Sequence, residues 1–361
     1  MVTLGVEEEY LLLDPDSGVP VPESRKVRAV ANLEATVNGQ EITPELLQAQ
    51  VEVATPVCSG LDEVGGHLVR LRGVVSAAAA EVGVRVVACG AAAVRGAEPP
   101  PVTSNARYLA ISTDGAQLVD EQLINGMHVH VAVPDRESGV AALNFVRPWL
   151  PVLVALGGNS PLWDGRDTGF SSWRTVIFGR WAVSGPPPEF ADAADYGRRT
   201  RALLDTAAIR DLRQLYWLAR LSETYPTIEV RALDVQLCAE DAVTLAGVVR
   251  ALVVHALSDG RRRVRAPAGQ PPELLASATW MAARYGLGGE LVDPATGRAR
   301  PAAQVAAGLI DLLTPALEQT GDLERVTHGV RQLVRNGSAA DRQRRAFRSG
   351  GLTAALGLSE F

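Results

Sequence analysis

TLGVEEEYLLL, at residues 3–13, is an apolar run interrupted by three consecutive glutamates. It ends at DPDSG, residues 14–18, a cluster of turn-forming residues. An apolar run of this length with a turn behind it predicts a β-strand. Because side chains alternate between the two faces of a strand, Glu7 and Glu9 point to the same face. The strand therefore carries two carboxylates on one side.

Three other segments also carry polar groups two residues apart on predicted strands. They are GMHVHV (126–131) with His128 and His130, TIEVR (227–231) with Glu229 and Arg231, and QAQVE (48–52) with Gln50 and Glu52. Any one such pair is commonly a solvated strand face, so the hypothesis rests on all of them together. A sheet face of carboxylates, imidazoles and arginine is a poor core, because uncompensated buried charge is expensive. We expect metal ions or counter-charges to compensate it.

The residue types on this face favour phosphate chemistry with a hard metal ion. Carboxylate oxygens with an imidazole suit Mg²⁺ or Mn²⁺, and these ions usually accompany phosphate. Lys26 is the only lysine and follows no glycine-rich loop, which excludes a P-loop and disfavours pyridoxal phosphate. Phosphate must then be bound by arginine, backbone amides and metal ions. The candidate clamps are Arg174, Arg180, Arg220 and Arg231, and Asp234 is a candidate to orient an arginine.

Composition restricts the class of protein. The chain has 361 residues, 47% of them hydrophobic, which is enough for a large core. A formal net charge of −6 without a basic stripe argues against a nucleic-acid partner. The first residues lack a signal-peptide pattern, and the apolar stretches are too short or too charged for a membrane span. The scattered cysteines fit a reduced cytosol. We expect a cytoplasmic protein with no membrane or nucleic-acid partner.

Helices and strands are mixed along the chain without strict βαβ alternation. Apolar spacing predicts a long helix over residues 61–82, and Thr43-Pro44-Glu45 has the pattern of a helix start. Further helices are expected at 136–156 (kinked at Pro148 and Pro151), 192–208, 240–257, 273–285, 302–317, 323–334 and 339–348, further strands at 84–89 and 214–221, and a basic loop at 261–272. The mixture predicts an α+β fold in one catalytic domain, residues 1–361.

Several stretches match, in order and at compatible spacing, the motifs of a known family. They are residues 4–12, 43–47, 50–56, 126–131, 147–151, 159–163, 165–169, 179–181, 225–231 and 289–294. Any one alone would be weak, but together they run nearly from end to end and form a specific signal. On these residues the chain resembles the carboxylate–amine ligase family, the YbdK-like or type 2 glutamate–cysteine ligase group.

The resemblance implies a fold similar to the catalytic domain of glutamine synthetase, with a curved antiparallel sheet lining the active site and helices packed outside. It also implies ATP and Mg²⁺ (Mn²⁺ possible in its place), and transfer of the γ-phosphoryl group to a carboxylate. An amine then displaces phosphate from the acyl phosphate to give an amide. The expected substrates are glutamate and cysteine or another amino acid, and the expected assembly is a homodimer.

By the family pattern the metal ligands are Glu7, Glu9, Glu52, His128 and Glu229. Arg231 would be a phosphate clamp, and Arg174 and Arg220 would assist with phosphate or carboxylate. Together with the reasoning from the residues, this makes Arg174, Arg220 and Arg231 the candidate catalytic residues. Arg174, Arg180 and Arg231 are the candidates for binding the nucleotide.

The chain departs from the family pattern at Asn125, where cysteine is common, at Gly157 and Gly158, and at Leu162. None of these removes a predicted metal ligand, so we expect them to bear on substrate shape. Two alternatives remain open. An amidohydrolase-type metal hydrolase also uses a His-x-His strand, but it needs a β/α barrel and more histidine ligands. A non-catalytic ATP-binding protein could use the same scaffold.

Overall fold

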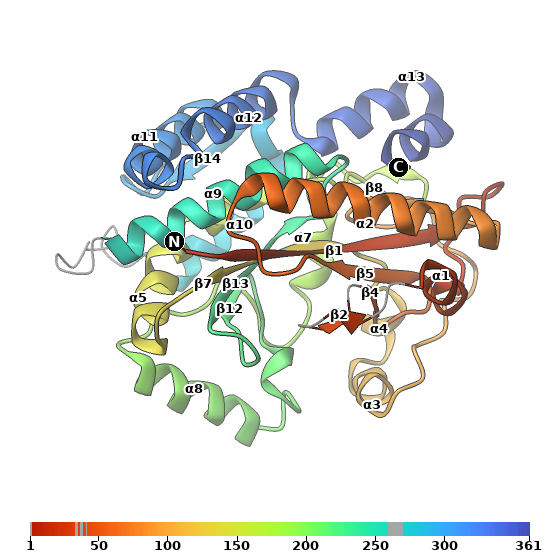
Figure 1. Cartoon of the computed structure of the whole chain (residues 1–361), viewed down its shortest axis with the longest axis horizontal. Helices are drawn as coiled ribbons and strands as arrows, with labels where there is room; N and C mark the ends of the chain where they lie inside the picture. The colour runs from red at the N-terminus through yellow and green to blue at the C-terminus, as the bar shows by residue number, and fades with distance from the viewer. Residues whose placement is uncertain (1, 33–34, 37–38, 41, 259–269) are drawn as a thin grey trace.

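An antiparallel sheet forms the centre of the protein (Figure 1). The computed structural model describes residues 2–32, 35–36, 39–40, 42–258 and 270–361. Within these residues the sheet has seven strands, in the order β12-β13-β7-β1-β5-β4, with β6 also paired to β1. The strands are β1 (Leu4–Leu13), β4 (Ile42–Pro44), β5 (Gln50–Ala54), β6 (Arg85–Val87), β7 (Gly126–Ala132), β12 (Ala219–Leu221) and β13 (Thr227–Asp234). Every pairing in this sheet is antiparallel.

The register of the sheet places the predicted polar residues opposite one another. On β1, Glu9 pairs with Glu52 of β5, and Glu7 pairs with His128 of β7. On the other side of β7, His130 pairs with Glu229. Directly opposed residues on neighbouring strands share a face and lie close together. The sheet therefore collects these side chains on one face.

Helices cover the opposite face of the sheet in two layers, as Figure 1 shows. The inner layer contains α2 (Leu61–Val82) and α9 (Ala239–Ser258), and the outer layer contains α11 (Ala302–Thr320), α12 (Leu323–Asn336) and α13 (Ala339–Ser359). Every residue from 242 to 254 of α9 is buried, because this helix packs against α2, α5, α11, α12 and β7. A helix that is apolar all round belongs inside the protein.

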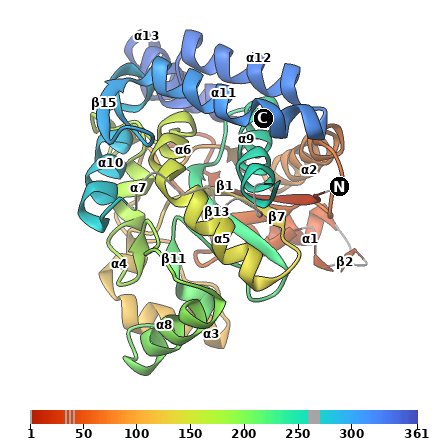
Figure 2. The ribbon, with the colours of Figure 1, turned by 90° about the vertical axis from the view of Figure 1, so that its left-hand side faces the viewer.

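The polar face of the sheet is flanked by shorter segments. Helices α3 (Ala106–Gly115) and α8 (Ala193–Asp205) lie on this side in both views (Figures 1 and 2). The other helices are α1 (Ser24–Ala31), α4 (Gln117–Asp120), α5 (Arg136–Val146), α6 (Leu150–Leu156), α7 (Trp173–Phe178) and α10 (Pro272–Tyr285), with 3₁₀ turns η1 (Arg147–Trp149), η2 (Leu212–Gln214) and η3 (Gly286–Gly288). Small two-stranded sheets join β2 (Ala35–Thr36) to β3 (Gly39–Gln40), β8 (Leu162–Trp163) to β9 (Arg166–Asp167), β10 (Ser184–Gly185) to β11 (Tyr216–Trp217), and β14 (Glu290–Asp293) to β15 (Arg298–Pro301).

The predicted α+β fold, with an antiparallel sheet and helices outside it, is confirmed. Helix α2 has the bounds predicted for it, and the helix at 136–156 is divided into α5, η1 and α6 at Pro148 and Pro151. A cluster of buried apolar side chains extends from Leu4 to Leu356. The single domain over residues 1–361 stays a prediction.

Some local predictions were wrong. Thr43-Pro44-Glu45 does not start a helix, because residues 42–44 form edge strand β4, in which Thr43 pairs with Glu52. An edge strand tolerates proline, whose missing N–H is needed by no further neighbour. The segment expected as one strand at 214–221 is broken into η2, β11 and β12. Helices α1 and α3 were not predicted, and most of the basic loop at 261–272 lies outside the described residues.

Two helical stretches have the length and apolar composition of a membrane span. They are Arg136–Leu156 and Ala239–Ser258, and 89% and 72% of their most apolar windows are buried inside the protein. Core helices of this kind pass the same test, so the finding gives little support for a membrane protein.

The middle glutamate of β1, Glu8, points to the helical side of the sheet. It is fully buried and forms a two-pronged ion pair with Arg72 of α2, at 3.0 Å (Nε to Oε2) and 2.6 Å (Nη2 to Oε1). The Tyr10 hydroxyl also donates to Glu8, at 2.5 Å. Arg72 donates further bonds to the backbone carbonyls of Gln236 and Leu237, just after β13. One guanidinium therefore ties β1 to the end of β13.

Replacing Arg72 with methionine should destabilise the protein strongly. The substitution keeps an apolar stem but leaves the Glu8 carboxylate buried without its counter-charge, which costs about 3–5 kcal/mol. Urea unfolding measures the loss. Asp62→Asn is the matched control, because Asp62 lies on the same helix, pairs with Arg325 and has a 98% exposed side chain. The control should unfold as the wild type does; a loss for Arg72→Met as small as that of the control would contradict this account.

Candidate active site

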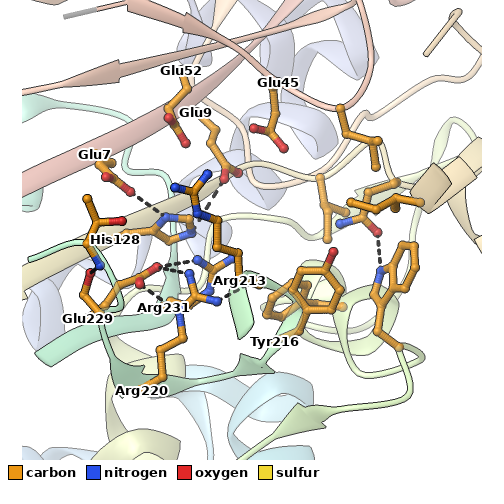
Figure 3. A pocket seen from close by; sticks show the side chains of 18 of the residues that line it. Glu7, Glu9, Glu45, Glu52, His128, Arg213, Tyr216, Arg220, Glu229 and Arg231 are labelled. Atoms are coloured by element: carbon orange, nitrogen blue, oxygen red, sulfur yellow. Dashed lines mark hydrogen bonds and ion pairs between the residues drawn. The ribbon is translucent and has the colours of Figure 1, made fainter. Parts of the chain in front are cut away.

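A cavity of about 300 Å³ opens on the polar face of the sheet. Its floor is made by strands β1, β5, β7, β12 and β13, and its walls by α3, α7 and the loops around them. Figure 3 shows the carboxylates of Glu7, Glu9, Glu45 and Glu52 gathered beside His128, with Arg220 and Arg231 around Glu229. The alternation of β1, β5, β7 and β13 turns these side chains toward the cavity.

The carboxylates and histidines are close enough to share metal ions. Three sets of ligand atoms each lie within 4.8 Å of one another: Glu7, Glu52 and His128; Glu7, His130 and Glu229; and Glu9, Glu45 and Glu52. His128 places Nδ1 3.1 Å from Glu7 Oε2 and Nε2 3.6 Å from Glu9 Oε1. Its buried Nε2 has no hydrogen-bond partner among the described residues. A buried nitrogen without a partner among carboxylates fits a metal ligand.

Two arginines hold Glu229 in place. Arg220 donates to both of its carboxylate oxygens, at 2.8 Å (Nε to Oε2) and 3.0 Å (Nη2 to Oε1), and Arg231 pairs with Oε1. Arg220 also donates to the backbone carbonyl of Arg213, at 2.6 Å. Arg220 is therefore fully engaged, whereas the Nε of Arg231 has no hydrogen-bond partner among the described residues. Arg231 keeps donor capacity for a bound anion.

Arg174 reaches the cavity from α7 and is 2% exposed. Its Nη1 bonds the backbone carbonyl of Arg231 at 3.2 Å, and its Nε is buried without a partner among the described residues. Gly126 lies close to it, and a Cβ there would lie 2.9 Å from its Cζ and displace the guanidinium group. Phe178 lies beneath both guanidinium groups, with ring-centroid distances of 5.1 Å to Arg174 and 5.7 Å to Arg231. Packing therefore fixes Arg174 while leaving one donor free.

Asp234 holds the segment that carries Arg174. Its carboxylate accepts bonds from the backbone N–H of Asn159 (2.8 Å) and from the hydroxyls of Ser160 (2.7 Å) and Ser172 (2.8 Å). Arg174 Nη1 lies 3.9 Å from the same carboxylate. The expected role of Asp234 in orienting an arginine therefore fits the geometry, mainly through the backbone and hydroxyls of the neighbouring loops.

The carboxylates of the cavity differ in charge state because their surroundings differ. Burial raises the pKa of Glu52 well above its usual value, and the negative charges of Glu7, Glu45 and Glu9 add to this. Burial, and then Glu9, raises the pKa of Glu45 to about 7. Burial would also raise the pKa of Glu7 and of Glu229. Nearby positive charge outweighs it, from His130 for Glu7 and from Arg231 and Arg220 for Glu229, and both pKa values are lowered.

The two histidines shift in opposite directions. Burial lowers the pKa of His128, and the charge of Arg231 lowers it further. A neutral imidazole is the form that binds a metal ion. Burial alone would lower the pKa of His130, but the adjacent Glu7 carboxylate raises it. His130 also bonds the Thr227 hydroxyl through Nδ1, at 3.0 Å.

The structure brings eight of the nine predicted site residues to this cavity. They are Glu7, Glu9, Glu52, His128, Arg174, Arg220, Glu229 and Arg231. Arg180 does not line it; its guanidinium pairs with Glu121 at the surface, and its predicted role in nucleotide binding stays a prediction. The positions where the chain departs from the family pattern, Asn125, Gly157, Gly158 and Leu162, do not line it either.

Several cavity residues escaped the sequence reasoning. Glu45 was assigned to a helix start, but it follows strand β4, and its carboxylate groups with those of Glu9 and Glu52. Arg107 and Tyr108 come from the unpredicted helix α3. Phe178, Trp181 and Tyr216 form an aromatic wall, with ring centroids 5.5 Å (Phe178–Tyr216) and 5.3 Å (Trp181–Tyr216) apart. Of these residues only Glu45 could have been predicted from the sequence, because a turn at residues 45–49 between two paired strands would place it near Glu52.

Comparison with known proteins assigns the family. The family model "Glutamate-cysteine ligase family 2(GCS2)" matches residues 3–356. The chain belongs to glutamate–cysteine ligase family 2. It is 42% identical over 347 residues to a protein of Saccharopolyspora erythraea, covering 96% of this chain and 90% of that one. It is 38% identical over 350 residues to one of Rhodopirellula baltica, covering 95% and 92%. These relatives are named "Putative glutamate--cysteine ligase 2-1" and "Putative glutamate--cysteine ligase 2".

Solved structures give the same fold. A glutamate–cysteine ligase of Francisella tularensis in complex with AMP aligns with a TM-score of 0.74 at 13% identity, covering 99% of this chain and 87% of that one. A bifunctional glutathione synthetase of Pasteurella multocida aligns with a TM-score of 0.69 at 16% identity, covering 99% and 51%. The predicted family is confirmed, and with it an ATP-dependent carbon–nitrogen ligase. The antiparallel sheet excludes the β/α barrel of an amidohydrolase.

The raised pKa of Glu45 predicts how pH affects stability without metal. A carboxyl group whose pKa is about 4.3 when unfolded and about 7 when folded stabilises the protein at low pH. That contribution is lost as the pH rises from about 4.3 to about 7, by on the order of 3 kcal/mol. Urea unfolding in EDTA measures the free energy of unfolding at pH 5 and at pH 8. This free energy should fall more between the two pH values for the wild type than for Glu45→Gln.

Mg²⁺ should reverse this loss at pH 8, because a bound cation compensates the ionised carboxylates. Glu81→Gln, at an exposed position on α2, serves as the control and should follow the wild type. An identical pH dependence in the wild type and in Glu45→Gln would show that burial and Glu9 do not raise the pKa of Glu45 as described.

Proposed function

We propose that the protein joins the γ-carboxylate of glutamate to the amine of cysteine or another amino acid, with ATP as the energy source and Mg²⁺ at the carboxylate cluster. The observation that carries the proposal is the single sheet face on which carboxylates, a neutral histidine and arginines converge, two of these arginines having an Nε without a partner among the described residues. Hard oxygen ligands beside cationic forks are the groups that metal–phosphate chemistry needs.

The cluster fits Mg²⁺ better than a softer ion. The ligand atoms are carboxylate oxygens and the nitrogens of His128 and His130, and no cysteine lines the cavity within the described chain. The residues that would hold the ions are Glu7, Glu9, Glu45, Glu52, His128 and Glu229. Mg²⁺ bound there would neutralise charge on the phosphates and polarise the transferred phosphoryl group. Glu45 extends the predicted ligand set.

In this site arginines bind phosphate, which is the task of a P-loop in many other nucleotide-binding proteins. Arg231 and Arg174 line the cavity, and the Nε of each has no hydrogen-bond partner among the described residues, so both can bind phosphate or carboxylate oxygens. Arg220 acts indirectly, because it donates its hydrogen bonds to the Glu229 carboxylate and to the backbone carbonyl of Arg213. The ligase of Francisella tularensis was solved in complex with AMP, which supports a nucleotide as one of the ligands. The aromatic wall offers flat apolar surface for a base or a side chain.

The reaction requires two substitutions in sequence. The γ-phosphoryl group passes from ATP to an oxygen of the substrate carboxylate, which breaks the bond to ADP and forms an acyl phosphate. The amine nitrogen then attacks the acyl carbon, phosphate leaves with the shared oxygen, and the amine loses a proton. The fixed arginines favour both steps, because they are already oriented toward the charge that develops. Neighbouring Arg174 and Arg231 are thus assigned to charge stabilisation and positioning.

Glu229→Gln and Glu52→Gln should each lower amine-dependent ADP release by at least about a hundredfold, since each removes a charge from the metal cluster. The protein is incubated with ATP, Mg²⁺ and glutamate, with and without cysteine and then other amines, and products are identified by mass spectrometry. Glu290→Gln, an exposed position on β14, should keep wild-type turnover. Circular dichroism confirms that each variant is folded.

A γ-glutamyl product that disappears in both variants supports the proposal and names the amine. ADP release without any condensed product would retain phosphoryl transfer but reject these substrates. Full turnover in both variants would reject the assignment of the cluster. Nucleotide binding with no turnover of any acid–amine pair would favour a non-catalytic binding protein. The expected homodimer and the cytoplasmic location stay predictions.

A further inference from the structure

A second cavity, of about 620 Å³, lies between the end of α12, the start of α13, the end of α10 and the loop after β9. We name it the arginine cavity, because Arg284, Arg335, Arg344, Arg345 and Arg348 line it. It shares no lining residue with the active-site cavity. The helices that form it lie on the far side of the sheet from α3 and α8 (Figure 2).

The charges around the arginine cavity do not balance. Two carboxylates line it with the five guanidinium groups, and both are already engaged. Asp167 accepts bonds from Arg344 at 3.0 and 3.1 Å (Nε to each oxygen). Asp341 caps α13, where it accepts the backbone N–H and the hydroxyl of Ser338. The lining therefore keeps an excess of positive charge in a chain whose net charge is −6.

Within the part of the chain that the structure describes, most of these arginines have no acidic partner. Arg345 donates to the backbone carbonyl of Asn336 at 2.6 Å, and Arg284 donates to that of Gly169, so their charges are not neutralised. Neither Arg335 nor Arg348 has an ion-pair partner among the residues that the structure describes, and both are exposed. Guanidinium forks around a hollow match the oxygens of phosphate and carboxylate groups.

One wall of the arginine cavity is formed by Asp167 and Gly169, which belong to the segment that leads to Arg174. Arg344 bonds the Phe170 carbonyl at 2.6 Å and lies 3.4 Å from the Ser171 hydroxyl, as well as pairing with Asp167. The next residue, Ser172, bonds Asp234 at 2.8 Å. Arg174 follows two residues later. An anion that drew Arg344 away from Asp167 would loosen this segment at its outer side.

We propose that the arginine cavity binds a small anion with at least two negative charges, and that binding there alters the hold on Arg174. Phosphoryl and polycarboxylate compounds share this chemistry, so two probes separate them: pyrophosphate and citrate. Binding is measured by titration calorimetry on the full chain in EDTA, without ATP. This readout does not depend on ligase activity, so it stands or fails separately from the proposed function.

The decisive comparison uses the double variant Arg345→Ala/Arg348→Ala. It should bind the preferred probe at least tenfold more weakly than the wild type. Arg331→Ala is the matched control, because Arg331 is an exposed arginine one turn before Arg335 on α12 and does not line the cavity. The control should keep wild-type affinity. Absence of saturable binding by both probes, or equal affinity in the double variant, would overturn the site.

The link to Arg174 has its own test. With free Mg²⁺ held constant, because both probes chelate it, a saturating probe should change the KM for ATP at least threefold in the wild type. The change should vanish in the double variant, whose turnover without the probe should match the wild type. A probe that binds the wild type but leaves the KM and kcat unchanged would overturn the link. An equal shift of the KM in the double variant would also overturn it, because the probe would then act at the active site.

Discussion

Three consecutive glutamates on the central strand β1 set the constraint that the rest of the structure satisfies. Strand geometry sends Glu8 to one face and Glu7 and Glu9 to the other, and every one of these carboxylates needs compensation. On the helical side, Arg72 compensates Glu8 inside the core. On the open side, histidines, arginines and the proposed metal ions compensate Glu7 and Glu9. One short sequence thus both anchors the sheet to its helices and creates the site.

Arginine carries nearly all the positive charge of this protein, and its geometry shapes the site. Arg220 and Arg231 hold Glu229 from two directions, and Arg174 is fixed by Phe178, Gly126 and the loops that Asp234 organises. Packing and hydrogen bonds hold these groups in place without a ligand. A ligase of this kind works chiefly by positioning and by neutralising charge, so arginines held in this way serve the chemistry directly.

Most of the site could be predicted from the sequence because it lies on strands. A period of two residues places Glu7 with Glu9 and Glu229 with Arg231, whatever the surrounding fold is. The sheet register that joins these strands could not be read from spacing, and the resemblance to a ligase family supplied only the set of residues expected to act together. Glu45 was missed because Pro44 has the pattern of a helix start, although it ends an edge strand. The aromatic wall was missed because its elements are short: Phe178 ends the six-residue helix α7, Tyr216 begins the two-residue strand β11, and Trp181 lies outside both, so no period could be read.

The most direct test of the account is a crystal structure of the protein grown with Mn²⁺ and ADP, with anomalous scattering used to locate manganese. We expect anomalous peaks on the polar face of the sheet, bound by carboxylates of Glu7, Glu9, Glu52 and Glu229 and by His128, with the nucleotide phosphates beside Arg231. Manganese and nucleotide bound away from this face, with the carboxylate cluster left without ions, would contradict the central claim.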